Sequence, residues 1–185
     1  MKTYQVYVLM SSVTSNNLSI CKSIIESLDP TSKVTLCRFD KAVTFYQRDV
    51  VVKDINLPSP RSDKGVSALM DAMSEIIRVA EIHEPHLWSD QDDNRVSIIV
   101  MADVCDNSSK HYSLSYVKDV IAYRMTQEWN FVFMTKDEDV AQQYVDFGAS
   151  PDSIILYTND TFDHASKCVV ELIGKHNATE TSLDF

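Results

Sequence analysis

Two histidines lie three residues apart in the run His83-Glu84-Pro85-His86, where imidazole nitrogens could serve as transition-metal ligands. Pro85 breaks the helical register that would place both rings on one side, so we expect a solvated loop rather than a metal site. The acidic run Asp90-Gln91-Asp92-Asp93-Asn94 has the alternating carboxylates of a calcium loop. It lacks the central glycine and the terminal glutamate of such loops, which favours a charged turn.

The four cysteines show no metal-binding or redox pattern. They are Cys21, Cys37, Cys105 and Cys168. None forms a CxxC pair, and we expect none to have a histidine at zinc-binding spacing. Most lie in apolar surroundings, which is typical of buried free thiols.

Motifs for covalent or nucleotide chemistry are absent from the sequence. There is no Gly-x-Ser-x-Gly nucleophile motif, no phosphate-binding glycine loop and no Gly-x-Gly-x-x-Gly. The chain has 3 glycines in total, too few to build a nucleotide cradle with ease. We therefore expect a protein that is not an enzyme.

Apolar runs typical of strands alternate with segments of helical periodicity along almost the whole chain. The predicted strands are 4–10, 33–39, 43–52, 95–102, 131–134 and 153–157, with 43–52 either one strand or a short hairpin. The predicted helices are 17–28, 67–82, 113–129, 137–147 and 161–173, the last two ended by Gly148 and Gly174. This order predicts a doubly wound α/β domain over 1–176, with a mostly parallel central sheet, helices on both faces and a flexible tail at 177–185.

In a doubly wound fold, ligands bind at the carboxyl ends of the strands, near the point where the strand order reverses. The loops expected there are 11–16, 63–67 and 103–109. Around them the sequence reads Met10-Ser11-Ser12-Val13-Thr14, Gly65-Val66-Ser67-Ala68-Leu69-Met70-Asp71-Ala72 and Ala102-Asp103-Val104-Cys105-Asp106-Asn107-Ser108.

These segments are similar to three motifs of von Willebrand factor A (vWA) domains: Asp-x-Ser-x-Ser, Gly-Gly-Thr-Ala-Leu-x-Asp-Ala and Thr-Asp-Gly-x-Asp-Asn-Ser. The run Trp129-Asn130-Phe131-Val132-Phe133-Met134 also resembles a late strand of bacterial and phage members. The resemblance covers residues 4–175. It implies a vWA-like fold with a degenerate form of the family's metal-ion-dependent adhesion site (MIDAS).

The resemblance also implies which side chains would hold a divalent cation through oxygen atoms. The matching positions are Ser12, Thr14, Ser67 and Asp103. Met10 stands where the family has its first aspartate, and a thioether is a poor ligand for Mg²⁺. We therefore expect no cofactor, with Mg²⁺ as the alternative, and we expect the same four residues and the nearby Asp106 to form a partner-binding site.

The charge balance limits the partners. The formal net charge is −10, and an acidic surface repels phosphate backbones, which argues against direct nucleic-acid binding. No apolar run reaches the roughly 18 residues of a membrane span. The first ten residues are typical of a strand rather than a signal peptide, so a cytoplasmic location is expected.

The function that these observations favour is non-enzymatic binding of another protein through the loops at the carboxyl end of the sheet, without a metal. A magnesium-dependent adhesion-type binder is one alternative. The other rests on Leu183, Asp184 and Phe185, because a tail with this sequence is similar to short peptides that dock in the sliding clamps of DNA replication. Such a tail would make the chain a replication accessory factor.

Overall fold

A computed structural model describes residues 4–61, 65–83 and 95–178, and shows one six-stranded sheet. Its strands are β1 (Tyr4–Met10), β2 (Lys33–Phe39), β3 (Val43–Val51), β4 (Arg95–Met101), β5 (Asn130–Thr135) and β6 (Ile154–Leu156). They lie side by side in the order β3-β2-β1-β4-β5-β6. All neighbouring pairs are parallel except β2 and β3 at one edge.

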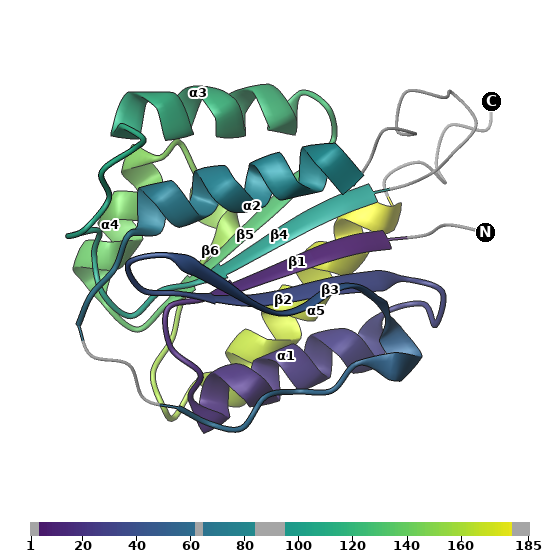
Figure 1. Cartoon of the computed structure of the whole chain (residues 1–185). Coiled ribbons are helices and arrows are strands. Elements are labelled where there is room, and N and C mark those ends of the chain that lie inside the picture. Colours follow the sequence, from purple (N-terminus) through teal and green to yellow (C-terminus); the bar gives the residue numbers. More distant parts are fainter. Residues whose placement is uncertain (1–3, 62–64, 84–94, 179–185) are drawn as a thin grey trace.

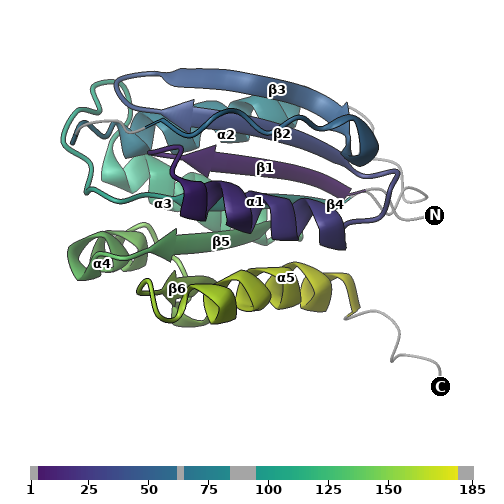
Figure 2. The same ribbon diagram turned by 90° about the horizontal axis from the view of Figure 1, so that it is seen from below.

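Helices cover both faces of the sheet (Figure 1). They are α1 (Ser15–Ser27), α2 (Leu69–His83), α3 (Leu114–Met125), α4 (Glu138–Asp146) and α5 (Phe162–Ala178), with short 3-10 turns at η1 (Val52–Asp54) and η2 (Pro151–Ser153). Helices α1 and α5 pack on one face, and α2, α3 and α4 pack on the other (Figures 1 and 2). This is the predicted doubly wound α/β architecture.

The central strands are buried on both faces because each side of the sheet carries its own apolar layer. Side chains alternate along β1: Leu9 faces the layer under α2, and Met10 faces the layer under α1 and α5. In the same way Val100 of β4 lies in the first layer and Val132 of β5 in the second. All four side chains are fully buried or nearly so, which confirms that these runs are core strands.

Most predicted bounds differ from the structure by one or two residues, and two differences have a visible backbone cause. Segment 43–51 is one strand rather than a hairpin, and Asp49 takes the left-handed conformation (φ 50°) where the pairing with β2 is irregular. Helix α3 ends at Met125 rather than 129, and Glu128 (φ 62°) then redirects the chain into the buried Trp129.

The prediction that Gly174 ends the last helix was wrong. Helix α5 continues through it to Ala178, two residues into the segment predicted as a tail. Gly148, in contrast, has φ 87° directly after α4 and its C-cap Phe147, as expected for a glycine that ends a helix. A glycine acts as a stop only where the chain needs a positive φ. Gly148 has one and the exposed Gly174 does not, so the helix continues through Gly174.

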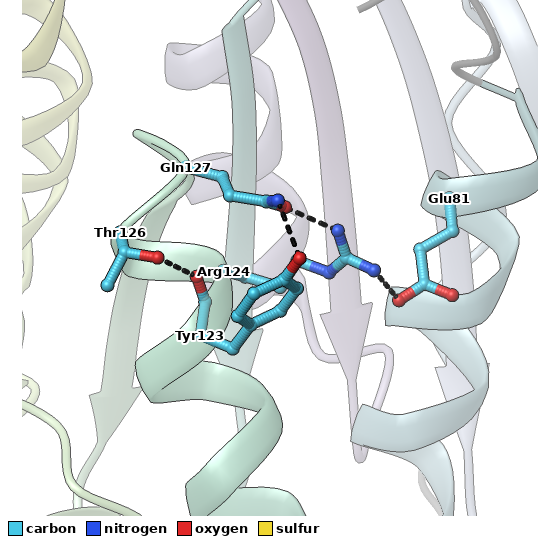
Figure 3. A network of polar contacts seen from close by, with 5 residues as sticks. All are labelled: Glu81, Tyr123, Arg124, Thr126 and Gln127. Carbon is cyan, nitrogen blue, oxygen red and sulfur yellow. Dashed lines mark hydrogen bonds and ion pairs between the residues drawn. The ribbon is translucent and has the colours of Figure 1, made fainter. Parts of the chain in front are cut away.

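A polar network joins the last turns of α2 and α3 (Figure 3). The Arg124 guanidinium lies within bonding distance of the Glu81 carboxylate and the Gln127 amide oxygen. Gln127 in turn donates to the Tyr123 hydroxyl at 3.1 Å, and the guanidinium lies over the Tyr123 and Trp129 rings. This network fixes α3 beside α2, the helix whose first turn contributes to the candidate site.

Candidate functional site

Strands β1 and β4 form the switch point of the sheet. The chain leaves β1 through α1 on one face and leaves β4 through α3 on the other, so the loops that follow the two strands diverge from their carboxyl ends. Two of the three loops expected from the sequence, 11–16 and 103–109, lie here, although α1 already begins at Ser15. Residues 65–67, which precede α2, are the described part of the third.

Ser12 and Asp103 meet at this switch point. The Ser12 hydroxyl donates to Asp103 Oδ2, and the Asp103 backbone N–H donates to Ser11 Oγ at 2.9 Å. Ser12 is 8% exposed, and the Asp103 side chain is half-buried. The two sequence-predicted site residues therefore lie together, held by hydrogen bonds between the loops that follow β1 and β4.

Asn17 supports this pair, although no motif in the sequence had indicated it. Its side-chain amide donates to the Ser12 carbonyl at 2.9 Å, and its Oδ1 accepts from the Tyr157 hydroxyl at 3.3 Å. Burial raises the pKa of Tyr157 to about 12, and the negative charge of Asp103 adds to the effect, so Tyr157 remains a protonated donor. A buried amide in the first turn of a helix was the available signal, because such groups need fixed partners.

Thr14 is a helix cap. Its hydroxyl oxygen accepts from the Asn17 backbone N–H at 3.1 Å, and it is the N-cap residue of α1. A threonine at this position satisfies one of the unpaired donors of the first turn. The side chain is exposed, so the contact fixes the direction in which α1 leaves the site.

Ser67 ties α2 to the loop that follows Asp103. Its N–H donates to Asn107 Oδ1 at 3.0 Å, and its carbonyl accepts from the N–H groups of Asn107 and Ser108 at 2.9 and 3.1 Å. The Ser67 hydroxyl is fully buried, and among the described residues it has no hydrogen-bond partner. A buried hydroxyl without a partner is uncommon in native proteins.

Asp106 caps α2 instead of joining Ser12 and Asp103. Its Oδ2 accepts from the Met70 backbone N–H at 2.8 Å and from the Ser109 hydroxyl. Its own N–H donates to Gln143 of α4 at 2.8 Å. Asp106 therefore supplies the negative charge that favours a helix N-terminus, from a loop far away in sequence.

Asp71 holds the far end of the same loop. Its carboxylate accepts from three backbone N–H groups, those of Lys110, His111 and Tyr112, at 2.9 to 3.0 Å. Partial burial acts to raise the pKa of Asp71, but these three hydrogen bonds outweigh it and hold the pKa below its ordinary value. The loop between β4 and α3 is thus fixed on α2 by two carboxylates.

Met10 does not fit a cation site. Its side chain is fully buried in the layer under α1 and α5, with its sulfur 3.6 Å from Cys21 Sγ. The oxygen set that remains has one carboxylate, Asp103, and Thr14 serves as a cap. Mg²⁺ prefers several hard oxygen ligands and gives up its waters reluctantly, so this donor set is a poor match for it.

Acidic side chains gather beside this edge of the sheet. Burial raises the pKa of the Cys105 thiol, and the negative charges of Asp137, Asp139 and Asp106 raise it further. Asp137 is the N-cap of α4, and Asp139 lies in its first turn. The carboxyl edge around Cys105 therefore has a negative potential, which would attract a positively charged surface.

Several residues considered as site candidates from the sequence fall outside the described residues. These are His86 and the acidic run 90–94, together with Leu183, Asp184 and Phe185 of the tail. In the ranges that are described, no three His, Cys, Asp or Glu side chains come close enough to hold a metal ion. No helix in those ranges is long and apolar enough to cross a membrane.

Comparison by sequence finds no matching family model and no matching curated protein. Comparison of structures finds solved folds of the same shape. Proximal thread matrix protein 1 from the mussel byssus superposes with a TM-score of 0.62 at 12% identity, over 93% of this chain and 46% of that one. The chain has a vWA-like fold. An aerotolerance-related membrane protein from Bacteroides fragilis gives a TM-score of 0.55 at 13% identity, over 95% and 100% of the two chains.

The VWA2 protein of Sulfolobus acidocaldarius, an ArnB paralog, is a third vWA-like neighbour, with a TM-score of 0.52 at 14% identity over 92% of this chain and 44% of its own. This chain thus spans less than half of the mussel and Sulfolobus proteins. A second structure of the mussel protein has a zinc-occupied MIDAS motif. These likenesses confirm the vWA-like fold predicted from the three loop segments.

Proposed function

We propose that this vWA-like chain is a non-enzymatic interaction module that binds a partner protein through the loops at the carboxyl end of the sheet, without a metal. The observation that carries the proposal is the hydrogen bond from Ser12 to Asp103, which uses the site's carboxylate within the protein. The loops around it are held by further protein contacts, so they present a preformed surface.

The position of these loops at the carboxyl end of the strands supports the proposal, because α/β sheets commonly bind ligands there. Thr14, Asp106 and Asp71 each accept hydrogen bonds from backbone N–H groups and so hold these loops in place. A preformed surface loses little conformational freedom on binding, which favours affinity. The acids around Cys105 favour a partner with a basic patch, since complementary charge speeds association.

Charge reversal at the carboxyl edge tests the proposal. Glu138→Lys and Asp139→Lys together alter two exposed side chains in the first turn of α4. A matched control, Glu26→Lys with Asp119→Lys, makes the same change in charge on exposed faces of α1 and α3. With each protein as bait in the presence of a chelator, the native chain and the control should capture the same partner, and the α4 variant should not.

Two outcomes count against the proposal. Equal capture by both variants would place the binding surface elsewhere, and capture that requires added Mg²⁺ would favour the adhesion-type alternative. The Ser67 hydroxyl, which is buried and has no hydrogen-bond partner in the described ranges, favours that alternative, because a hydroxyl oxygen is a ligand that Mg²⁺ accepts.

A further inference from the structure

Helix α5 carries a histidine and a cysteine one turn apart. His164 and Cys168 are four residues apart, so both side chains project from the same side of the helix. Cys168 Sγ lies 3.5 Å from His164 Nε2, with His164 exposed and Cys168 half-buried. The expectation from the sequence that no cysteine has a histidine at zinc-binding spacing was therefore wrong.

The separation of these two atoms matches the geometry of a metal chelate. Zinc bonds are about 2.3 Å to sulfur and about 2.0 Å to imidazole nitrogen, so two such ligands on a tetrahedral ion lie about 3.5 Å apart. The pair therefore needs little rearrangement to bind one ion through both atoms. Two rotamers already in place reduce the entropy that binding would otherwise cost.

We propose that His164 and Cys168 form a two-ligand site for Zn²⁺ or a similar thiophilic divalent ion. Thiolate and imidazole are ligands for zinc and its transition-metal neighbours, whereas Mg²⁺ requires oxygen. The ion displaces the thiol proton to solvent, and water or a second copy of the chain fills its two remaining positions. The site does not depend on the proposed binding function of the loops.

The other cysteines do not share this arrangement. Cys21 and Cys37 are fully buried, and burial raises the pKa of the Cys21 thiol to about 12, so neither thiol is accessible or readily deprotonated. Cys105 is half-buried, and nearby aspartates raise its pKa further, which disfavours its thiolate. In the part of the chain that the structure describes, Cys168 is thus the cysteine that has both access to solvent and an imidazole nearby.

Co²⁺ is a suitable probe for the full chain, because its absorption reports both tetrahedral geometry and thiolate coordination. The native protein should show a thiolate-to-cobalt charge-transfer band that added Zn²⁺ abolishes by displacement. Cys168→Ser should remove the band. Loss of even an outer-shell partner weakens metal affinity roughly tenfold or more, so His164→Gln should lower Co²⁺ affinity by at least that factor.

Cys105→Ser is the matched control and should leave the band unchanged. A stoichiometry of one ion per chain would mean that water completes the shell, and one ion per two chains that a second copy does; either supports the site. Absence of the band, its persistence in Cys168→Ser, or its loss in Cys105→Ser would overturn the proposal. Equal melting temperatures of the metal-free variants would show that the substitutions leave folding intact.

Discussion

The Ser12 hydroxyl donates a hydrogen bond to the carboxylate of Asp103, a residue 91 positions later in the chain. This contact joins the loops after β1 and β4, the two strands between which the strand order of the sheet reverses. In a cation site both side chains would turn their oxygens to the ion. Here they satisfy each other, and the neighbouring Met10 adds no oxygen.

Weak binding of Mg²⁺ or none follows from this arrangement. Calorimetric titration of the native chain with Mg²⁺ or Mn²⁺ should give no micromolar dissociation constant. Met10→Asp restores the second carboxylate, but at a buried position beside Cys21. We therefore expect this variant to be less stable than the native chain without Mg²⁺, because an unpaired buried charge is costly, and to gain melting temperature when Mg²⁺ is added.

An unchanged melting temperature of Met10→Asp on addition of Mg²⁺ would show that the remaining oxygens are not placed to complete a site. Micromolar binding by the native chain would contradict the first expectation outright. Leu9→Asp, on the opposite face of the same strand, is the control and should not respond to Mg²⁺.

Val100→Ala should lower the free energy of unfolding by roughly 1–3 kcal/mol, from lost burial and the cavity left behind. Val100 is fully buried in β4 between β1 and β5. Urea unfolding measures the change. Val145→Ala is the matched control, because Val145 lies 43% exposed on α4 and its truncation should alter stability little. Equal effects of the two substitutions would contradict the central position of β4.

The stability that Asp71 contributes should depend on pH. The pKa of Asp71 is lower in the folded state than in the unfolded state. Its contribution to the free energy of unfolding is therefore fully present above the unfolded pKa of about 3.9. That contribution is lost as the pH falls through the lower folded pKa. Asp71→Asn should cost about 1 kcal/mol near neutral pH, since a neutral amide accepts the three N–H groups less well. The difference in the free energy of unfolding between the native chain and the variant should shrink in acid below about pH 4.

Chemical unfolding at a series of pH values measures this difference. Asp119→Asn, which alters an exposed carboxylate on α3, is the control and should show no comparable pH dependence. If the free energies of unfolding of the native and Asp71→Asn proteins differ by a constant amount across the acid range, the three hydrogen bonds do not stabilise the charged carboxylate of Asp71.

Deletion of residues 179–185 should leave the melting temperature unchanged. Residues 179–182 are Thr-Glu-Thr-Ser, so the first part of this segment has no apolar side chain whose burial could offset the entropy of ordering it. Leu183 and Phe185 are the exceptions. A fall of several degrees would mean that they pack on the domain.

If residues 179–185 are not needed for stability, we expect any role of theirs to be the recruitment of the chain to a partner. Binding to a purified sliding clamp can be measured with the native chain and with a double variant, Leu183→Ala and Phe185→Ala. Two anchors in a preformed pocket would contribute roughly 3–5 kcal/mol before association costs are subtracted. Clamp binding that is equal in the two proteins, or absent from both, would remove the support for a replication accessory factor.

Local patterns in the sequence determined most of the fold. Strand β1 and strand β2 were predicted to the residue, because each is a run of β-formers bounded by polar residues. Gly148 acts as the predicted stop, since that role depends on neighbours within a few residues. The three loop segments likewise predicted the vWA-like fold that the structural comparisons confirm.

Tertiary structure decided what the same residues do. Asp103 and Asp106 are three residues apart in one loop, yet one meets Ser12 and the other caps α2, because each carboxylate is directed by partners from distant parts of the chain. The contact between His164 and Cys168, in contrast, is local, because a helix brings residues four apart to the same side and both lie within the helix predicted from the sequence.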